Sequence, residues 1–180
     1  MNLSERDDSR GFSMIEVLVS MIIIAVGVLG MVALQSKAIP YTQDSVQRNT
    51  AIMLVDDLMG IIRSASADCT SANTCIKAPG TNFPAAAASC IPTPATLSSQ
   101  IGCWAVRAGK ALPGGSSLLN GSFYICRSTA PGDTSACTST NTLDTELEIQ
   151  VAWTVKSTTD CMVGNASTNT CTYRLRTRIK

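Results

Sequence analysis

The chain is organised around one short sequence, Arg10-Gly11-Phe12-Ser13-Met14-Ile15-Glu16-Val17, which runs straight into an apolar segment ending at about Leu34. No residue from Val17 to Ser36 is charged, and roughly twenty helical residues cross about 30 Å of hydrocarbon. A charge at bilayer depth costs roughly 3 kcal/mol, so Glu16 needs a water-facing position or a partner. We therefore expect a single membrane span with one carboxylate at its start.

Glu16 also has a purely structural interpretation. Ser13 and Glu16 fit the capping box Ser-x-x-Glu, and a carboxylate in the first turn suits the helix dipole. However, no further charge follows until Lys37, which places the first turn close to the apolar region. This pattern favours a functional role for the carboxylate over a simple cap.

The cysteines indicate the compartment of the remaining chain. All eight follow the apolar segment, and the chain has no histidine and no Cys-x-x-Cys pair. This pattern is typical of disulfides formed in an oxidising compartment and disfavours zinc or a redox dithiol, so we expect the carboxyl-terminal side to be periplasmic or extracellular. Pairing of sequence neighbours would join Cys69 with Cys75, Cys90 with Cys103, Cys126 with Cys137 and Cys161 with Cys171, but four bridges allow many other pairings.

Helical periodicity resumes after Pro40, a residue that removes a backbone donor and would kink a continuing helix. Apolar residues recur at spacings of three and four, and polar residues take the other face. The apolar set is Val46, Ile52, Met53, Val55, Leu58, Met59 and Ile62, and the polar set is Asp44, Gln47, Arg48, Asp56, Asp57 and Arg63. We expect one long helix with an amphipathic second half; the alternative is a membrane anchor followed by a separate helix.

The rest of the chain reads as a long loop followed by strands. Periodicity fades between Ala65 and Gly102, and short apolar runs at 104–106 and 122–125 predict strands separated by turns. Two further segments, 146–155 and 173–180, alternate strictly between apolar and polar residues. If they pair antiparallel, an arginine row at 174, 176 and 178 lies beside Glu146 and Glu148, in cross-strand pairs of about 0.2–1 kcal/mol each. We interpret this row as a solvated strand face; the alternative is a basic surface for an acidic partner.

The order Gly11, then Phe12-Ser13-Met14-Ile15-Glu16, then an apolar span resembles the type IV prepilin signal of bacterial pilins and pseudopilins. The resemblance implies that a membrane prepilin peptidase cuts between Gly11 and Phe12 and that the new amine of Phe12 is methylated. It also implies that Glu16 meets the amine of a neighbouring subunit during assembly.

The resemblance further implies a type IV pilin-like α+β fold, in which a long N-terminal helix packs on a disulfide-stapled antiparallel sheet. The expected parts are a cleaved leader at 1–11, a transmembrane and assembly helix at 12–36, its amphipathic half at 37–67, and an exported loop and sheet domain at 68–180. In pilins the segment that links helix and sheet is exposed, so 68–102 is a candidate contact region.

Within this family, the apolar segment and the eight cysteines resemble minor pilins more than major ones. That implies a non-enzymatic subunit that primes assembly of a type IV pilus and supports twitching motility and adhesion. Its partners would be other minor and major pilins, the prepilin peptidase and methyltransferase, and a tip adhesin. It would lie in the inner membrane with its C-terminal domain in the periplasm, and then in the extracellular fibre.

Two other functions remain open: a minor pseudopilin of type II secretion, and a signal-anchored periplasmic binding protein. An enzyme is not expected, because the chain has no histidine base, no Gly-rich phosphate loop and no nucleophile motif. We predict no cofactor and no metal. The net charge of +1 suggests no nucleic-acid partner.

Overall fold

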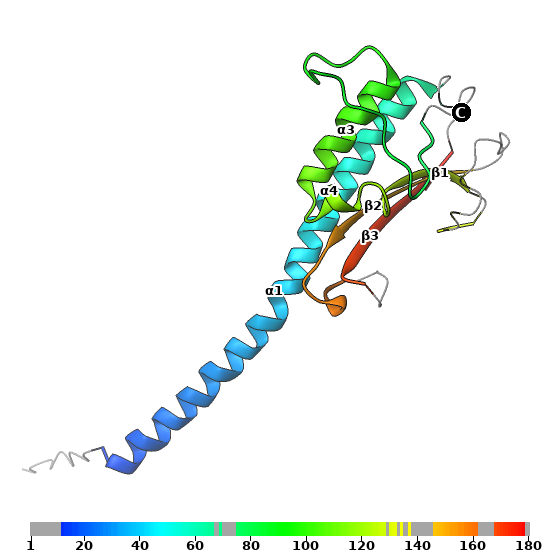
Figure 1. The fold of residues 1–180 in the computed structure, drawn as a ribbon. Helices are drawn as coiled ribbons and strands as arrows, with labels where there is room; N and C mark the ends of the chain where they lie inside the picture. Colours follow the sequence, from blue (N-terminus) through cyan, green and yellow to red (C-terminus); the bar gives the residue numbers. More distant parts are fainter. Residues whose placement is uncertain are drawn as a thin grey trace, which may run out of the picture. The chain divides into compact units, whose positions relative to one another are not determined.

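The computed structural model describes residues 12–66, 69, 75–128, 130–132, 134, 137, 146–161 and 168–178. The chain divides into two compact units, Met1–Pro40 and Tyr41–Lys180 (Figure 1). The predicted leader 1–11, including Gly11, lies outside the described residues.

Helix α1 extends from Met14 to Ser64 with Pro40 inside it. Proline has no N–H, so the Ser36 carbonyl loses one intrahelical donor, yet helical structure continues on both sides. The alternative of a membrane anchor followed by a separate helix is therefore wrong.

The sheet of the second unit confirms the predicted pairing of the last two alternating segments. Its strands are β1 (Tyr124–Ser128), β2 (Glu146–Thr154) and β3 (Thr170–Thr177), in the antiparallel order β1-β2-β3. Ile149 lies opposite Leu175, and Glu148 lies opposite Arg176. The apolar positions of β2 and β3 thus share one face, as the alternation predicts.

The core of this unit forms where the second half of α1 packs on that face of the sheet (Figure 1). Its helix residues follow a stripe with helical spacing, and β2 contributes every second residue. The buried residues of this contact include Ala51, Leu54, Val55, Leu58, Met59 and Ile62 from α1, and Leu147, Ile149, Val151 and Trp153 from β2.

Three α1 residues differ from their predicted faces. Val46 is 56% exposed and Met53 is 72% exposed, whereas Asp44 is buried at 1%. Asp44 lies seven residues, or about two turns, before Ala51 on the buried stripe, while Met53 lies about 200° around the helix from Ala51. Asp44 pairs with Arg48 at 3.5 Å. Position on the stripe, rather than side-chain polarity, decides burial here.

The predicted strand at 104–106 is wrong, because those residues belong to helix α3 (Leu97–Ala111). Thr96 caps this helix by accepting a hydrogen bond from the Ser99 N–H. The helix buries Leu97, Ile101, Trp104, Ala105 and Ala108, at helical spacing, and the Trp104 indole donates to the Leu54 carbonyl of α1 at 2.8 Å. The short helix α4 (Gly115–Leu118) and the 3-10 turn η1 (Thr158–Asp160) complete the described elements.

Candidate functional site

The start of α1 holds the residues that the sequence singles out for processing and assembly. The Ser13 carbonyl accepts hydrogen bonds from the backbone N–H groups of Glu16 and Val17, at 3.0 and 3.3 Å, which places Glu16 in the first turn. Phe12, the residue directly before Ser13, is 82% exposed. Within the described part of the chain, the Glu16 carboxylate has no hydrogen-bond or ion-pair partner. It is therefore available to a group outside the described residues.

The apolar half of α1 is exposed along its whole length. Every residue from Phe12 to Ile39 is exposed, and the helix is long and apolar enough to cross a membrane. Gly27 and Gly30 open onto empty space, since a Cβ placed on either would meet no atom within 4 Å. Burial of this surface requires a lipid bilayer or other protein chains.

The eight cysteines form four disulfides, in the pairing that sequence proximity favours: Cys69–Cys75, Cys90–Cys103, Cys126–Cys137 and Cys161–Cys171. Their Cα atoms lie 4.8–5.8 Å apart. Loops of this length contribute about 2–3 kcal/mol each by chain entropy. The bridges fasten connecting segments to regular elements, such as the Cys90 loop to α3.

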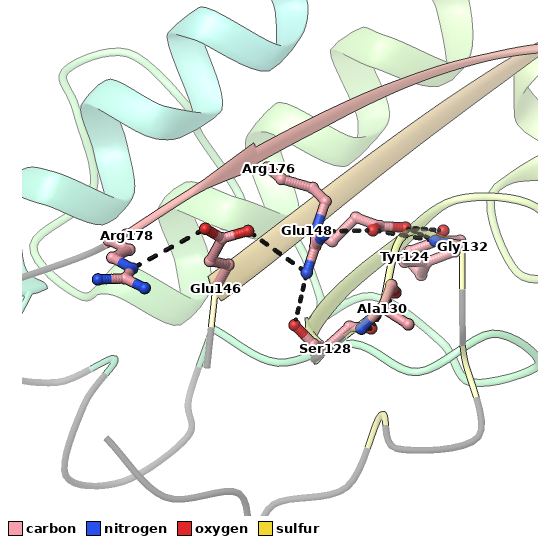
Figure 2. A network of polar contacts seen from close by, with 8 residues as sticks. All are labelled: Tyr124, Ser128, Ala130, Gly132, Glu146, Glu148, Arg176 and Arg178. Atoms are coloured by element: carbon pink, nitrogen blue, oxygen red, sulfur yellow. Dashed lines mark hydrogen bonds and ion pairs between the residues drawn. The ribbon is translucent and has the colours of Figure 1, made fainter. Parts of the chain in front are cut away.

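The charge rows of β2 and β3 do meet, and Glu148 and Arg176 depart from the predicted solvated face. Glu148 is fully buried, and Arg176 contacts it through Nε at 3.3 Å while its Nη2 reaches Glu146 at 3.3 Å (Figure 2). Arg176 also donates to the Ser128 carbonyl at 2.9 Å. Arg174 is exposed, and Arg178 has 74% of its side chain exposed, so both match the predicted solvation.

Glu148 is buried because the turn after β1 covers it. The Gly132 N–H donates to both carboxylate oxygens at 2.9 and 3.1 Å, and the Tyr124 hydroxyl donates at 2.5 Å (Figure 2). Burial, together with this bond to Glu148, raises the pKa of Tyr124 well above its usual value, so the hydroxyl remains a donor. The Cys126–Cys137 bridge closes the loop that carries Gly132. Alternation alone could not reveal this cover.

Sequence reasoning also missed Lys77, which is only 3% exposed. Its ammonium donates to the carbonyls of Leu119, Asn120 and Phe123 at 2.6–2.9 Å and lies 4.9 Å from the Phe83 ring centroid. Burial lowers the pKa of Lys77 to about 8. Lys77 also bridges to Ile125 of β1, so it ties the connecting segment to the sheet. A single lysine in a connecting segment carries no sequence signal for such burial.

No group of three His, Cys, Asp or Glu side chains that could hold a metal ion occurs within the described ranges. The polar networks there are ion pairs and hydrogen bonds that stabilise the sheet and its loops. The features that point outward are the start of α1 and its apolar half.

Comparison with known proteins bears on this same region. The family model of the prokaryotic N-terminal methylation motif matches residues 6–32, a range that contains Gly11, Phe12 and Glu16. Neither the curated proteins nor the solved structures include a significant match to the chain. The motif and the α+β layout together support a type IV pilin-like protein with a prepilin-type signal.

Proposed function

We propose that this chain is a minor pilin, a non-enzymatic subunit that primes assembly of a bacterial type IV pilus and is incorporated into it, at its tip. One observation carries the proposal: the apolar half of α1 is wholly exposed and coincides with the methylation motif. Such a surface suits a subunit that is first held in lipid and then buried among the helices of other subunits.

The roles of single residues follow from this proposal. The prepilin peptidase cuts between Gly11 and Phe12, and the methyltransferase modifies the new Phe12 amine. The carboxylate of Glu16, one turn into α1, then pairs with the positive amine of a neighbouring pilin. Two charges that are each costly in an apolar surrounding are tolerable as a pair.

The finer assignment rests on sequence resemblance. The runs at 11–20 and 27–35 are similar to the type IV pilus modification protein PilV, and the dense cysteines differ from the single disulfide loop that is typical of major pilins. The four bridges support export to an oxidising compartment. The protein would thus be anchored in the inner membrane with its head in the periplasm, join the extracellular fibre beside an adhesin, and support twitching motility and adhesion.

Substitution of Glu16 tests the assembly role. Glu16→Ala should be cleaved normally, but its incorporation into sheared fibres should fall at least about tenfold, because the neighbour's amine loses its partner. Ser20→Ala is the matched control, since the Ser20 hydroxyl only donates to the Glu16 carbonyl within α1. Normal piliation in Glu16→Ala would contradict the amine pairing.

A minor pseudopilin of type II secretion remains the second candidate, because the same motif and the same layout support it equally. Deletion of the gene distinguishes the two functions. The pilus function predicts loss of twitching with normal protein secretion, whereas a secretion defect with normal twitching would favour the pseudopilin.

A further inference from the structure

The outer face of the sheet, opposite the helix-packed face, contains a polar hollow of about 630 Å³. A cross-strand row crosses it, with Tyr124 of β1 opposite Gln150 of β2, and Gln150 opposite Arg174 of β3. Further along β3, Thr172 and Thr170 line the same hollow. Its size lies within the range of about 300–1,000 Å³ that is usual for ligand sites.

Arg174 differs from the other two arginines of its row. Arg176 pairs with Glu146 and Glu148, and Arg178 pairs with Glu146. Within the described part of the chain, Arg174 has no acidic or hydrogen-bonding partner, and the described residues that line the hollow include no carboxylate. Among the described residues that line the hollow, Arg174 is thus the charged side chain.

Groups that can form hydrogen bonds surround Arg174. The Gln150 amide donates to the Ser122 carbonyl at 2.7 Å, which orients its own oxygen as an acceptor. The hydroxyls of Thr170 and Thr172 have no side-chain partner among the described residues. Tyr124, the aromatic member of the lining, is only 3% exposed and its hydroxyl is engaged by Glu148, so it offers no open ring face on which a sugar could stack.

We infer that this hollow binds an acidic peptide segment of a partner protein. A carboxylate of the segment pairs with Arg174, and its backbone groups bond to Gln150, Thr170 and Thr172. Guanidinium and carboxylate are complementary in both charge and geometry. This binding does not rest on the proposed pilus function, since it uses only residues of the sheet and its loops.

The test uses the full mature chain in detergent and two dye-labelled, blocked peptides, one alternating serine with glutamate and the other alternating serine with glutamine. Fluorescence anisotropy should show that the acidic peptide binds at least about tenfold more tightly than the neutral one. Added salt should reduce this preference, because the pair lies near the surface.

Arg174→Gln should abolish the preference for the acidic peptide. Arg178→Gln is the matched control, because Arg178 directly follows the same strand, is exposed and does not line the hollow. Equal binding of both peptides, or an equal loss in both variants, would overturn the inference. Binding of an acidic oligosaccharide but not of the acidic peptide, lost in Arg174→Gln, would overturn the peptide assignment and make the hollow a sugar site.

Discussion

The two halves of α1 have the same secondary structure and opposite surroundings. From Phe12 to Ile39 every residue is exposed although most are apolar, whereas between Ala51 and Ile62 the apolar stripe is buried against the sheet and α3. The first half thus contributes nothing to the packed core of its own chain. Its hydrophobic surface can be buried only by lipid or by other chains.

The largest expected effect of this difference is on the stability of the head. Leu58 is fully buried and Leu29 is 69% exposed, both within α1. Leu58→Ala should lower the free energy of unfolding by about 3–5 kcal/mol, through lost burial and a cavity. Leu29→Ala should change it by less than about 0.5 kcal/mol. Chemical unfolding of the mature chain in detergent, followed by the fluorescence of the buried Trp104 and Trp153, measures the free energy of unfolding of both variants. An equal loss of stability in the two variants would contradict the difference between the two halves of α1.

Lys77 should give the next largest effect, because it holds three carbonyls inside the head. Lys77→Met leaves these acceptors without their donor and should lower the free energy of unfolding by about 2–3 kcal/mol at neutral pH. The variant needs to be compared with wild type under non-reducing conditions at several pH values.

The pH dependence has a defined sign. Burial lowers the pKa of Lys77 from 10.5 to about 8, so above pH 8 the unfolded chain binds more protons than the folded one. The contribution of Lys77 to stability therefore rises between the folded and unfolded pKa values and is lost as the pH falls through about 8. The gap between wild type and Lys77→Met should widen by about 2 kcal/mol from pH 7 to about pH 9.5. A gap that narrows would show that the buried ammonium is not the titrating group.

Two glycines allow a comparison of a closely packed helix position with an open one. A Cβ on Gly102 of α3 would lie 2.5 Å from the Ala85 carbonyl oxygen, whereas a Cβ on Gly60 of α1 would meet no atom within 4 Å. Gly102→Ala should cost about 1–3 kcal/mol through overpacking. Gly60→Ala should stabilise by about 0.5–1 kcal/mol, because alanine favours the helix. Thermal unfolding of the two variants should shift in opposite directions, and a stabilised Gly102→Ala would rule out the close approach.

The smallest effect should come from the cap of α3. Thr96→Ala removes the hydroxyl that accepts from the Ser99 N–H and should cost about 1 kcal/mol. Ser98→Ala, an exposed change in the first turn of the same helix, is the control and should leave stability nearly unchanged. A similar midpoint for both variants in urea would show that Thr96 does not stabilise the helix.

Regular patterns in the sequence predicted much of this fold. The uncharged run places the first half of α1, and alternation in 146–155 and 173–180 predicts the pairing of β2 and β3 and brings Arg176 beside Glu148. Proximity along the chain favours the disulfides that are found. These features depend on neighbours in sequence or on one repeating period, so they are visible without the tertiary structure.

The features that the sequence did not predict depend on contacts between segments that are far apart in the chain or on the tertiary surroundings of a residue. The run at 104–106 is too short to distinguish strand from helix, and the spacing of Leu97, Ile101, Trp104 and Ala108, with Thr96 before it, was the available signal for α3. Burial of Glu148 requires a turn that the Cys126–Cys137 loop brings over it. Lys77 is buried by carbonyls more than forty residues away. Likewise, polarity alone put Asp44 on the wrong face.

For the candidate site, the motif at 6–32 agrees with the prepilin-type signal expected from Gly11, Phe12 and Glu16. The polar hollow around Arg174 had no such signal, since its described lining comes from three strands and from several connecting segments far apart in the sequence.

The central claim is that the exposed start of α1 is a processed end made for other subunits. Mass spectrometry of the amino terminus of the protein purified from its own membranes tests it most directly. We expect a chain that begins at methylated Phe12, without residues 1–11. An intact leader that still begins with Met1 would contradict the account and leave α1 as a signal anchor.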